Sequence, residues 1–162
     1  MTVEKRIDAL DAQILLALDL DPDATALAIA DDLGVARNTI HSRLRRLQAS
    51  GALRSFARRV DSQALGYTLI AFVSMSINQD AAEEAFSKLQ HIPEIIEIHA
   101  TTGDADLLAK VVAVDTGDLL RITKQMLGIE GVLRTSTAIS LQEVMPLRLR
   151  NLLEKAAGNK TT

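Results

Sequence analysis

The sequence of 162 residues has no cysteine and no tryptophan, three prolines and four aromatic residues, Phe56, Phe72, Phe86 and Tyr67. The absence of cysteine excludes a disulfide scaffold, thiolate catalysis and a cysteine-ligated zinc or iron–sulfur site, and it fits a reducing cytoplasm. No apolar run approaches the roughly 18 residues of a membrane span, and acidic residues within positions 1–20 argue against a signal peptide. We therefore expect a cytoplasmic chain without a membrane segment.

The apolar content is sufficient for packed cores. Hydrophobic residues make up 48% of the chain and charged residues 24%, so disorder is excluded as the main state. The length allows one domain or two small ones. Because aromatic side chains are scarce, stacking on single-stranded bases is disfavoured.

Charge is distributed unevenly along the chain. Seven arginines and no acidic residue lie between Arg37 and Arg59, whereas residues 1–36 carry eight acidic residues, one lysine and one arginine. The overall net charge of −3 therefore conceals a local charge of +7, which is typical of a polyanion-binding segment. The exclusive use of arginine favours bidentate contacts to phosphate or guanine. The alternative is a solvated helix face, but such faces usually mix both signs.

The N-terminal third predicts three short helices followed by a β-hairpin. The first helix ends at Asp21-Pro22-Asp23, and the second is capped by Thr25 and stopped by Gly34. The third runs to about Ala49, and its apolar stripe consists of Ile40, Leu44 and Leu47. The segment from Leu53 to Val60 is long enough for a two-stranded wing. Together these elements predict a winged helix-turn-helix over residues 1–60.

The second helix of a helix-turn-helix enters the major groove of double-stranded DNA. Asn38 can pair bidentately with adenine and Arg37 with guanine, whereas the other arginines are better placed for phosphate. The predicted DNA-binding residues are Arg37, Asn38, Thr39, His41, Ser42, Arg43, Arg45, Arg46, Arg54, Arg58 and Arg59.

The rest of the chain contains an internal repeat. Alternating apolar positions predict strands at 67–77, 96–100, 107–113 and 133–141, with helices around Phe86 and Ile122. An offset of 37 residues aligns Leu89 with Met126 and Ile92 with Ile129. Two strand–helix–strand copies predict a βαββαβ, ferredoxin-like domain, so the fold class is α+β.

One face of such a sheet has no helical cover. Ile70, Phe72, Leu108 and Val112 fall on that face, and an apolar patch of this kind usually marks an interface. We therefore expect a homodimer formed sheet to sheet, which would also present two DNA modules to two half-sites.

Several segments together resemble the Lrp/AsnC (leucine-responsive, or feast/famine) transcriptional regulators. Residues 7–15 resemble the opening helix of that family, residues 29–35 with 42–47 its helix-turn-helix, and residues 50–53 with 65–67 the start of its wing and regulatory domain. Gly103-Asp104-Ala105-Asp106 is similar to the family's Gly-Asp-aromatic-Asp loop. The resemblance covers residues 7–142.

The resemblance implies dimers that assemble into tetramers or octamers and a small amino-acid effector bound between regulatory domains. Asp104 or Asp106 would bind the ammonium group of the effector. Threonine hydroxyls and loop N–H groups would donate hydrogen bonds to its carboxylate. Without the resemblance, the Thr-Gly-Asp segment would be interpreted as a hairpin turn. The implied effector residues are Thr101, Thr102, Gly103, Asp104, Ala105, Asp106, Thr135, Ser136 and Thr137.

Two positions depart from the family pattern. Ala105 replaces the usual aromatic residue, so the pocket is enlarged, retuned or unused. Ala36 replaces the usual capping serine, at a cost of about 1 kcal/mol of helix stability. Without that cap, the sequence does not define where the third helix starts.

No pattern typical of an enzyme is present. His41, His91 and His99 form no metal-ligand pair, Asp8 and Asp11 are interpreted as surface or capping residues, and no nucleotide-binding or nucleophile motif occurs. We expect no cofactor and no metal site.

The expected domains are 1–60 for DNA binding, 61–66 as linker, 67–144 for effector binding and oligomerisation, and 145–162 as a helical tail at a dimer or assembly interface. The predicted function is a sequence-specific, nucleoid-associated DNA-binding regulator modulated by a small amino acid. Two alternatives remain: an effector-insensitive chromosome-organising DNA binder, and an amino-acid sensor that acts through protein partners.

Overall fold

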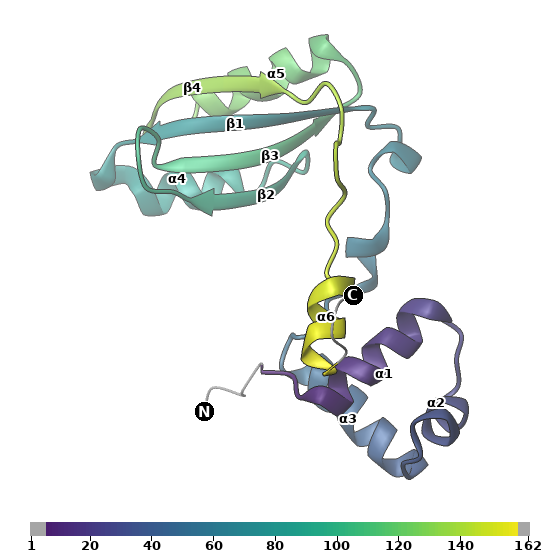
Figure 1. Cartoon of the computed structure of the whole chain (residues 1–162). Coiled ribbons are helices and arrows are strands. Elements are labelled where there is room, and N and C mark those ends of the chain that lie inside the picture. Colours follow the sequence, from purple (N-terminus) through teal and green to yellow (C-terminus); the bar gives the residue numbers. More distant parts are fainter. Residues whose placement is uncertain (1–5, 159–162) are drawn as a thin grey trace. The chain divides into compact units, whose positions relative to one another are not determined.

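The computed structural model describes residues 6–158, and the chain divides into two compact units (Figure 1). The first comprises the N-terminal residues up to Arg59 together with the C-terminal segment from Met145. The second comprises Val60–Val144. Each unit has its own hydrophobic core, and the two are described separately.

The first unit is built on three helices, α1 (Ala9–Leu20), α2 (Ala26–Leu33) and α3 (Arg37–Ala49). The predicted caps are confirmed. Thr25 Oγ1 accepts the Ala28 N–H at 3.1 Å, and Gly34 ends α2 with a φ of 65°, a left-handed conformation that favours glycine. Ile14, Ile29 and Ile40, one from each helix, form the buried centre of this unit.

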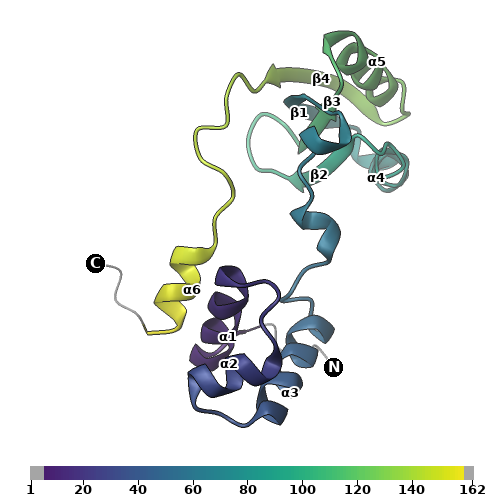
Figure 2. The ribbon, with the colours of Figure 1, turned by 90° about the vertical axis from the view of Figure 1, so that its right-hand side faces the viewer.

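A fourth helix, α6 (Arg150–Ala156), packs on α1 and belongs to the same unit (Figure 2). Arg150 Nη1 donates to Asp19 Oδ2 at 2.8 Å near the end of α1. Leu153 and Ala157 are half-buried on the same side of the helix, whereas Leu152 is exposed. The half-buried side of α6 packs against α1 of the same chain.

The predicted β-hairpin wing is wrong. Between Leu53 and Val60 the described chain has no strand, and Phe56–Arg59 form a 3₁₀ turn (η1). The Arg58 N–H donates to the Ser55 carbonyl at 3.2 Å and closes this turn. The segment has no glycine, asparagine or aspartate that would favour a tight hairpin turn. A second 3₁₀ turn (η2), Gln63–Leu65, follows in the other unit.

The second unit is the predicted βαββαβ domain. Its elements are β1 (Leu69–Ile77), α4 (Ala82–Leu89), β2 (Ile95–Ala100), β3 (Leu107–Ala113), α5 (Thr116–Leu127) and β4 (Val132–Ile139). A short 3₁₀ turn (η3), Gln79–Ala81, precedes α4. The strands form one antiparallel sheet in the order β2-β3-β1-β4. Figures 1 and 2 show both helices on one side of this sheet.

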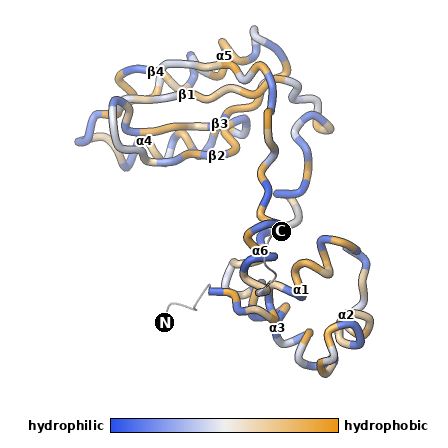
Figure 3. Tube along the Cα trace, viewed as in Figure 1, coloured by the Kyte–Doolittle hydropathy of each residue, from blue (hydrophilic) through white to orange (hydrophobic). Residues whose placement is uncertain are grey.

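The core of this unit lies between the sheet and its helices. Alternate residues of the central strands are buried there, Ala71, Val73 and Met75 from β1 among them. Figure 3 shows hydrophobic residues along much of β1 and β3. The 37-residue repeat is also confirmed, since β1–α4–β2 and β3–α5–β4 have the same order of elements.

The opposite face of the sheet carries the expected apolar side chains with one exception. Phe72 is 41% exposed, and Ile70 and Leu108 are half-buried. Val112 is only 2% exposed and is already buried within the chain. The chain just before β2 runs beside it, because the Val112 N–H donates to the Glu94 carbonyl at 2.9 Å. The exposed apolar patch is therefore smaller than the sequence predicts.

Candidate nucleic-acid interface and effector loop

The outward face of α3 carries polar and positively charged side chains. Arg37, Asn38, Ser42 and Arg45 are exposed, while Ile40 and Leu47 on the opposite side are buried. This separation fixes α3 through its apolar stripe and leaves the hydrogen-bonding groups near its N-terminus accessible. The arrangement is the one a groove-reading helix needs.

The other predicted residues of α3 differ in availability. His41 is exposed, whereas Thr39 is half-buried. Ser42 Oγ donates to the Thr39 carbonyl at 2.9 Å, so its proton is engaged within the helix and its oxygen remains an acceptor. Ala36 precedes α3 as its N-cap and makes no side-chain hydrogen bond, as its side chain predicts.

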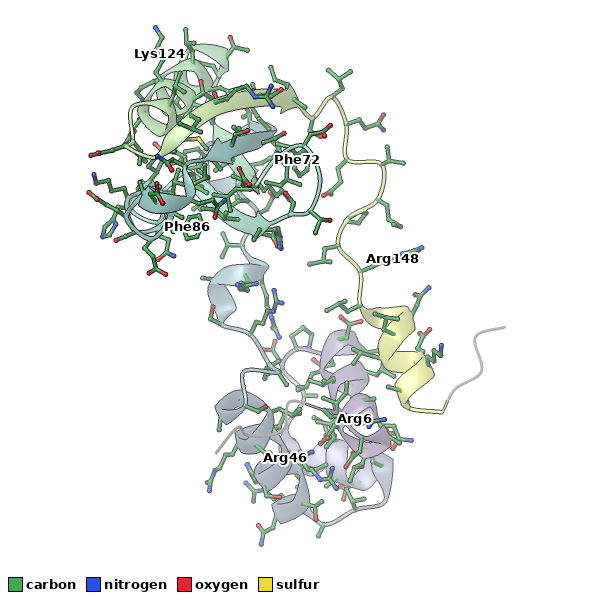
Figure 4. The ribbon with its side chains drawn as sticks, turned by 90° about the vertical axis from the view of Figure 1, so that its left-hand side faces the viewer. Arg6, Arg46, Phe72, Phe86, Lys124 and Arg148 are labelled. Atoms are coloured by element: carbon green, nitrogen blue, oxygen red, sulfur yellow. The ribbon has the colours of Figure 1, made fainter. Side chains whose placement is uncertain are left out.

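Arg43 and Arg46 point to α1 instead of standing free on the surface (Figure 4, where Arg46 is labelled). Arg43 contacts Asp8 and also donates from Nη1 to Asp11 Oδ1 at 3.1 Å. Arg46 pairs with the other oxygen of Asp11. Asp11 is completely buried, so its charge is balanced inside the unit. These four residues form what we call the α1–α3 ionic cluster.

The two acidic residues of the cluster also cap α1. Asp8 Oδ1 accepts the Asp11 N–H at 2.9 Å, and Asp11 Oδ2 accepts the Asp8 N–H at 3.0 Å, which is a capping box. The interpretation of these residues as capping acids is thus confirmed. The hydrogen bond from Arg43, together with the Asp11 N–H, lowers the pKa of Asp8 below its usual value.

The pairing of these acids with Arg43 and Arg46 was not predicted from the sequence. The available signal was the matched spacing, since two acids three residues apart in one helix face two arginines three residues apart in another. Spacing alone does not say which faces of two helices meet.

The remaining arginines, Arg54, Arg58 and Arg59, are exposed. They lie on the segment that follows α3, two of them in η1. Together with Arg37 and Arg45 they are the five arginines of residues 37–59 that are exposed and lie outside the α1–α3 ionic cluster.

The loop between β2 and β3 holds most of the implied effector residues and is tied together internally. Thr101 Oγ1 donates to the Ala105 carbonyl at 2.7 Å, and the Thr101 N–H donates to the Asp106 carbonyl at 2.9 Å. Gly103 has a φ of 112°, a backbone conformation that residues with a side chain rarely adopt. The hairpin-turn interpretation of this segment therefore describes its local structure.

Asp104 and Asp106 have different environments in this loop. The Asp106 carboxylate accepts the Ile77 N–H at 2.8 Å and so extends the hydrogen bonding of β1 beyond its partner strand. Asp104 is exposed, and within residues 6–158 no ion pair involves its carboxylate. Of the two candidates for an ammonium group, Asp104 is the accessible one.

The implied residues of β4 do not meet the loop within one chain. Thr135 pairs with Met75, which pairs with Leu107 at the start of β3, so two strand spacings of about 4.8 Å each separate β4 from β3. Thr135 and Thr137 share the helix-covered side, and Thr137 lines a groove with Leu120 of α5. Ser136 points to the open face with its partner Ser74.

The histidines and acids form no metal site in the described chain. Within residues 6–158, no group of three or more metal-ligating side chains is close enough to hold an ion. His91 Nδ1 lies 2.6 Å from the Ser87 carbonyl, and His99 Nε2 lies 2.9 Å from Glu97 Oε1 on the sheet surface. No helix within 6–158 has the length and apolar character to cross a membrane.

Comparisons with known proteins agree with these two units. The family model for the AsnC-type helix-turn-helix domain matches residues 7–48. The model for the Lrp/AsnC ligand binding domain matches residues 70–149. The helix-turn-helix match thus covers α1, α2 and most of α3, and the second match covers the sheet.

Relatives of nearly the same length align along most of the chain. The HTH-type transcriptional regulator FL11 of Pyrococcus furiosus is 35% identical over 136 residues, which are 84% of this chain and 90% of that protein. The HTH-type transcriptional regulator AldR of Mycolicibacterium smegmatis is 32% identical over 142 residues, 85% of this chain and 83% of its own.

Solved structures show the same fold. E. coli AsnC superposes with a TM-score of 0.80 at 26% identity, over 90% of this chain and 99% of that one. The Neisseria meningitidis regulator NMB0573, solved as a complex with L-Met, superposes with a TM-score of 0.76 at 24% identity, over 91% and 99%. With a helix-turn-helix unit, a βαββαβ unit and relatives above 30% identity, this chain is a member of the Lrp/AsnC family of transcriptional regulators.

Proposed function

We propose that this regulator reads double-stranded DNA through the outward face of α3 and the arginines that follow it. The observation that carries this proposal is the exposure of Arg37, Asn38 and Arg45 on the side of α3 opposite its buried stripe. Asn38 and Arg37 are the base-reading residues, because their side chains pair bidentately with adenine and guanine. Arg45, Arg54 and the arginines of η1 supply phosphate contacts, which give affinity and register.

The test is DNA affinity measured by fluorescence anisotropy across a range of salt concentrations. Arg45→Ala should weaken binding to all duplexes and reduce the slope of log affinity against log salt by about 0.9, the value for one phosphate contact. Asn38→Ala should instead reduce discrimination between duplexes selected from a random library and scrambled ones. Arg134→Ala, an exposed arginine of β4, is the control. Binding that shows neither salt dependence nor sequence preference would refute the proposal.

The second unit is proposed to bind a small amino acid at the β2–β3 loop. Asp104 is the exposed carboxylate for the ammonium group, and the Thr102 hydroxyl with the loop N–H groups can serve the carboxylate. Because β4 lies two strands away, we propose that its Ser136, which points to the open face of the sheet, completes the site from a neighbouring regulatory domain. The ligand would act through different affinities for two assembly states, which repack the DNA modules.

Calorimetry against the twenty amino acids tests this site, starting with L-methionine because the Neisseria protein of the same fold was solved with it. Asp104→Ala should abolish the binding heat and leave the melting temperature unchanged. Asp106→Ala should lower the free energy of unfolding by about 1–2 kcal/mol, since it leaves the Ile77 N–H without its acceptor. A flat response to all twenty compounds would contradict the effector proposal. It would favour the effector-insensitive, chromosome-organising alternative that Ala105 permits.

The proposed assembly is a homodimer joined through the open sheet face, with tetramers or octamers built from it. Phe72, Ile70 and Leu108 form the apolar part of that face. We further propose that the protein is a cytoplasmic, nucleoid-associated regulator and not an enzyme, in keeping with relatives named as transcriptional regulators.

A further inference from the structure

The α1–α3 ionic cluster divides the arginines of the predicted DNA face into two groups. Arg43 and Arg46 are paired with Asp8 and Asp11, and five others lie outside the cluster. The two pairs carry no net charge, so the local charge offered to DNA is +5 instead of the +7 of the sequence. The acids lie far from the arginines in sequence, and only the packing of α1 on α3 brings them together.

The paired arginines are not hidden from solvent. The side chains of Arg43 and Arg46 are 28% and 42% exposed, and Arg46 lies one residue beyond Arg45 of the outward face. At 3.6 residues per turn Arg46 lies about 100° around α3 from Arg45, so its long side chain can reach a phosphate beside the outward face, while Arg43 lies further round towards α1. Their guanidinium groups are instead held by carboxylates of α1, and the pKa of Asp8 is lowered, so that carboxylate stays charged at neutral pH.

We propose that Asp8 and Asp11 are specificity-determining residues that withhold Arg43 and Arg46 from the DNA backbone. Phosphate contacts raise affinity for every sequence equally, whereas base contacts discriminate. Each arginine neutralised inside the protein therefore removes sequence-independent affinity and leaves the contribution of Asn38 and Arg37 unchanged. This inference rests on the proposed DNA-binding function.

The variant Asp8→Asn tests the idea with little structural change. Asparagine is as good an N-cap as aspartate, so its Oδ1 keeps the bond to the Asp11 N–H, while the charge and the acceptor for Arg43 are lost. Asp11 is unsuitable for this purpose because it is completely buried. In Asp8→Asn, one carboxylate remains for two guanidinium groups, and one unit of positive charge becomes available to phosphate.

Asp19→Asn is the matched control. Asp19 lies on the same helix, pairs with Arg150 of α6 and is 52% exposed, against 51% for Asp8. Both variants raise the net charge by one unit. The two positions are about 16 Å apart along α1, beyond the Debye length of about 10 Å at 0.1 M salt, so Asp19 should act weakly at the cluster.

The experiment measures the affinity of the full chain for a random-sequence duplex between about 50 and 200 mM salt. We expect Asp8→Asn to steepen the salt slope by up to about 0.9 and to tighten binding by up to about eightfold at 0.1 M salt. Asp19→Asn and the charge-neutral double variant Asp8→Asn/Arg43→Gln should both match the wild type.

Two results would overturn the inference while the DNA-binding function stands. One is a slope for Asp8→Asn no steeper than that of Asp19→Asn. The other is a loss of about 0.9 in slope for the double variant, which would mean that Arg43 contacts phosphate in the wild type. The double variant keeps the second result available even if the single variant unfolds. A wild type without salt-dependent DNA binding would instead refute the proposed function itself.

Discussion

Several charged side chains of this protein form structural hydrogen bonds and ion pairs that their charge alone does not predict. Asp106 would suit an amino-acid ammonium group, yet its carboxylate completes the hydrogen bonding of β1 at Ile77. Arg43 and Arg46 would suit phosphate, yet they balance a buried carboxylate. In the first case the group that needs a partner is the Ile77 N–H, and in the second it is the buried Asp11 carboxylate. Leaving either group without a hydrogen-bond partner would lower the free energy of unfolding.

The ionic cluster predicts an acid-dependent contribution to stability. The pKa of Asp8 is lowered by Arg43, so this residue stabilises the fold at pH values above the ordinary aspartate pKa of about 3.9. That stabilisation is lost as the pH falls through the lower folded-state value. Urea unfolding of wild type and Asp8→Asn between about pH 2 and pH 7 should show a difference at neutral pH that shrinks below about pH 4. A constant difference across that range would contradict the role of this charge.

The start of α3 offers a stabilising substitution. Ala36 has the extended backbone of an N-cap, with a φ of −70° and a ψ of 140°, but no side-chain acceptor for the first N–H groups. Ala36→Ser should raise the free energy of unfolding by about 1 kcal/mol in urea denaturation. The matched control is Thr25→Ala, which removes the existing cap of α2 and should lower it by a similar amount. No gain in Ala36→Ser would show that solvent already satisfies this helix end.

At the scale of elements, α6 extends the DNA-binding unit beyond the three helices that local sequence patterns predict. Its half-buried Leu153 lies on the side that packs on α1, and its exposed Arg150 pairs with Asp19 of that helix. Residues 6–59 and 145–158 therefore belong to the same unit, with the βαββαβ domain inserted between them. That domain is therefore joined to the helix-turn-helix unit at two points of the chain, after Arg59 and before Met145.

The packing of α6 predicts different effects at two adjacent leucines. Leu153→Ala should lower the free energy of unfolding by about 1 kcal/mol, since a half-buried leucine loses part of its apolar contact area. Leu152 is 63% exposed, and Leu152→Ala should change it by less than about 0.5 kcal/mol. Equal effects at the two positions, measured by thermal or urea unfolding, would show that α6 does not dock through this side.

At the scale of the whole molecule, the open sheet face determines the proposed assembly. Two exposed phenylalanines allow a direct test, because Phe72 lies on that face and Phe86 on helix α4, with exposures of 41% and 38%. Phe72→Ser should shift the protein towards monomer in sedimentation velocity, whereas Phe86→Ser should leave the assembly unchanged. If Phe86→Ser alone dissociates it, the interface involves the helical side and the sheet-to-sheet proposal is wrong.

Three features could be predicted from the amino-acid sequence: the helices α1 to α3 of the first unit, the order of the βαββαβ repeat and the family. Apolar periodicity and caps such as Thr25 and Gly34 involve residues close together in the chain, so they can be recognised in the sequence without knowledge of the fold. The prediction of a β-hairpin wing was wrong because residues 53–60 have a weak strand pattern and contain no residue that favours a tight turn.

Which of the predicted site residues are accessible depends instead on how the helices and strands pack. Asp11 and Arg46 are 35 residues apart in the chain, and their pairing depends on how α1 packs on α3. Likewise, Thr135 in β4 and Asp104 in the loop between β2 and β3 lie apart because β1 stands between β4 and β3 in the sheet. The distribution of arginines along the sequence places the positive charge in residues 37–59. The packing of α1 on α3 determines how many of these arginines remain available to DNA.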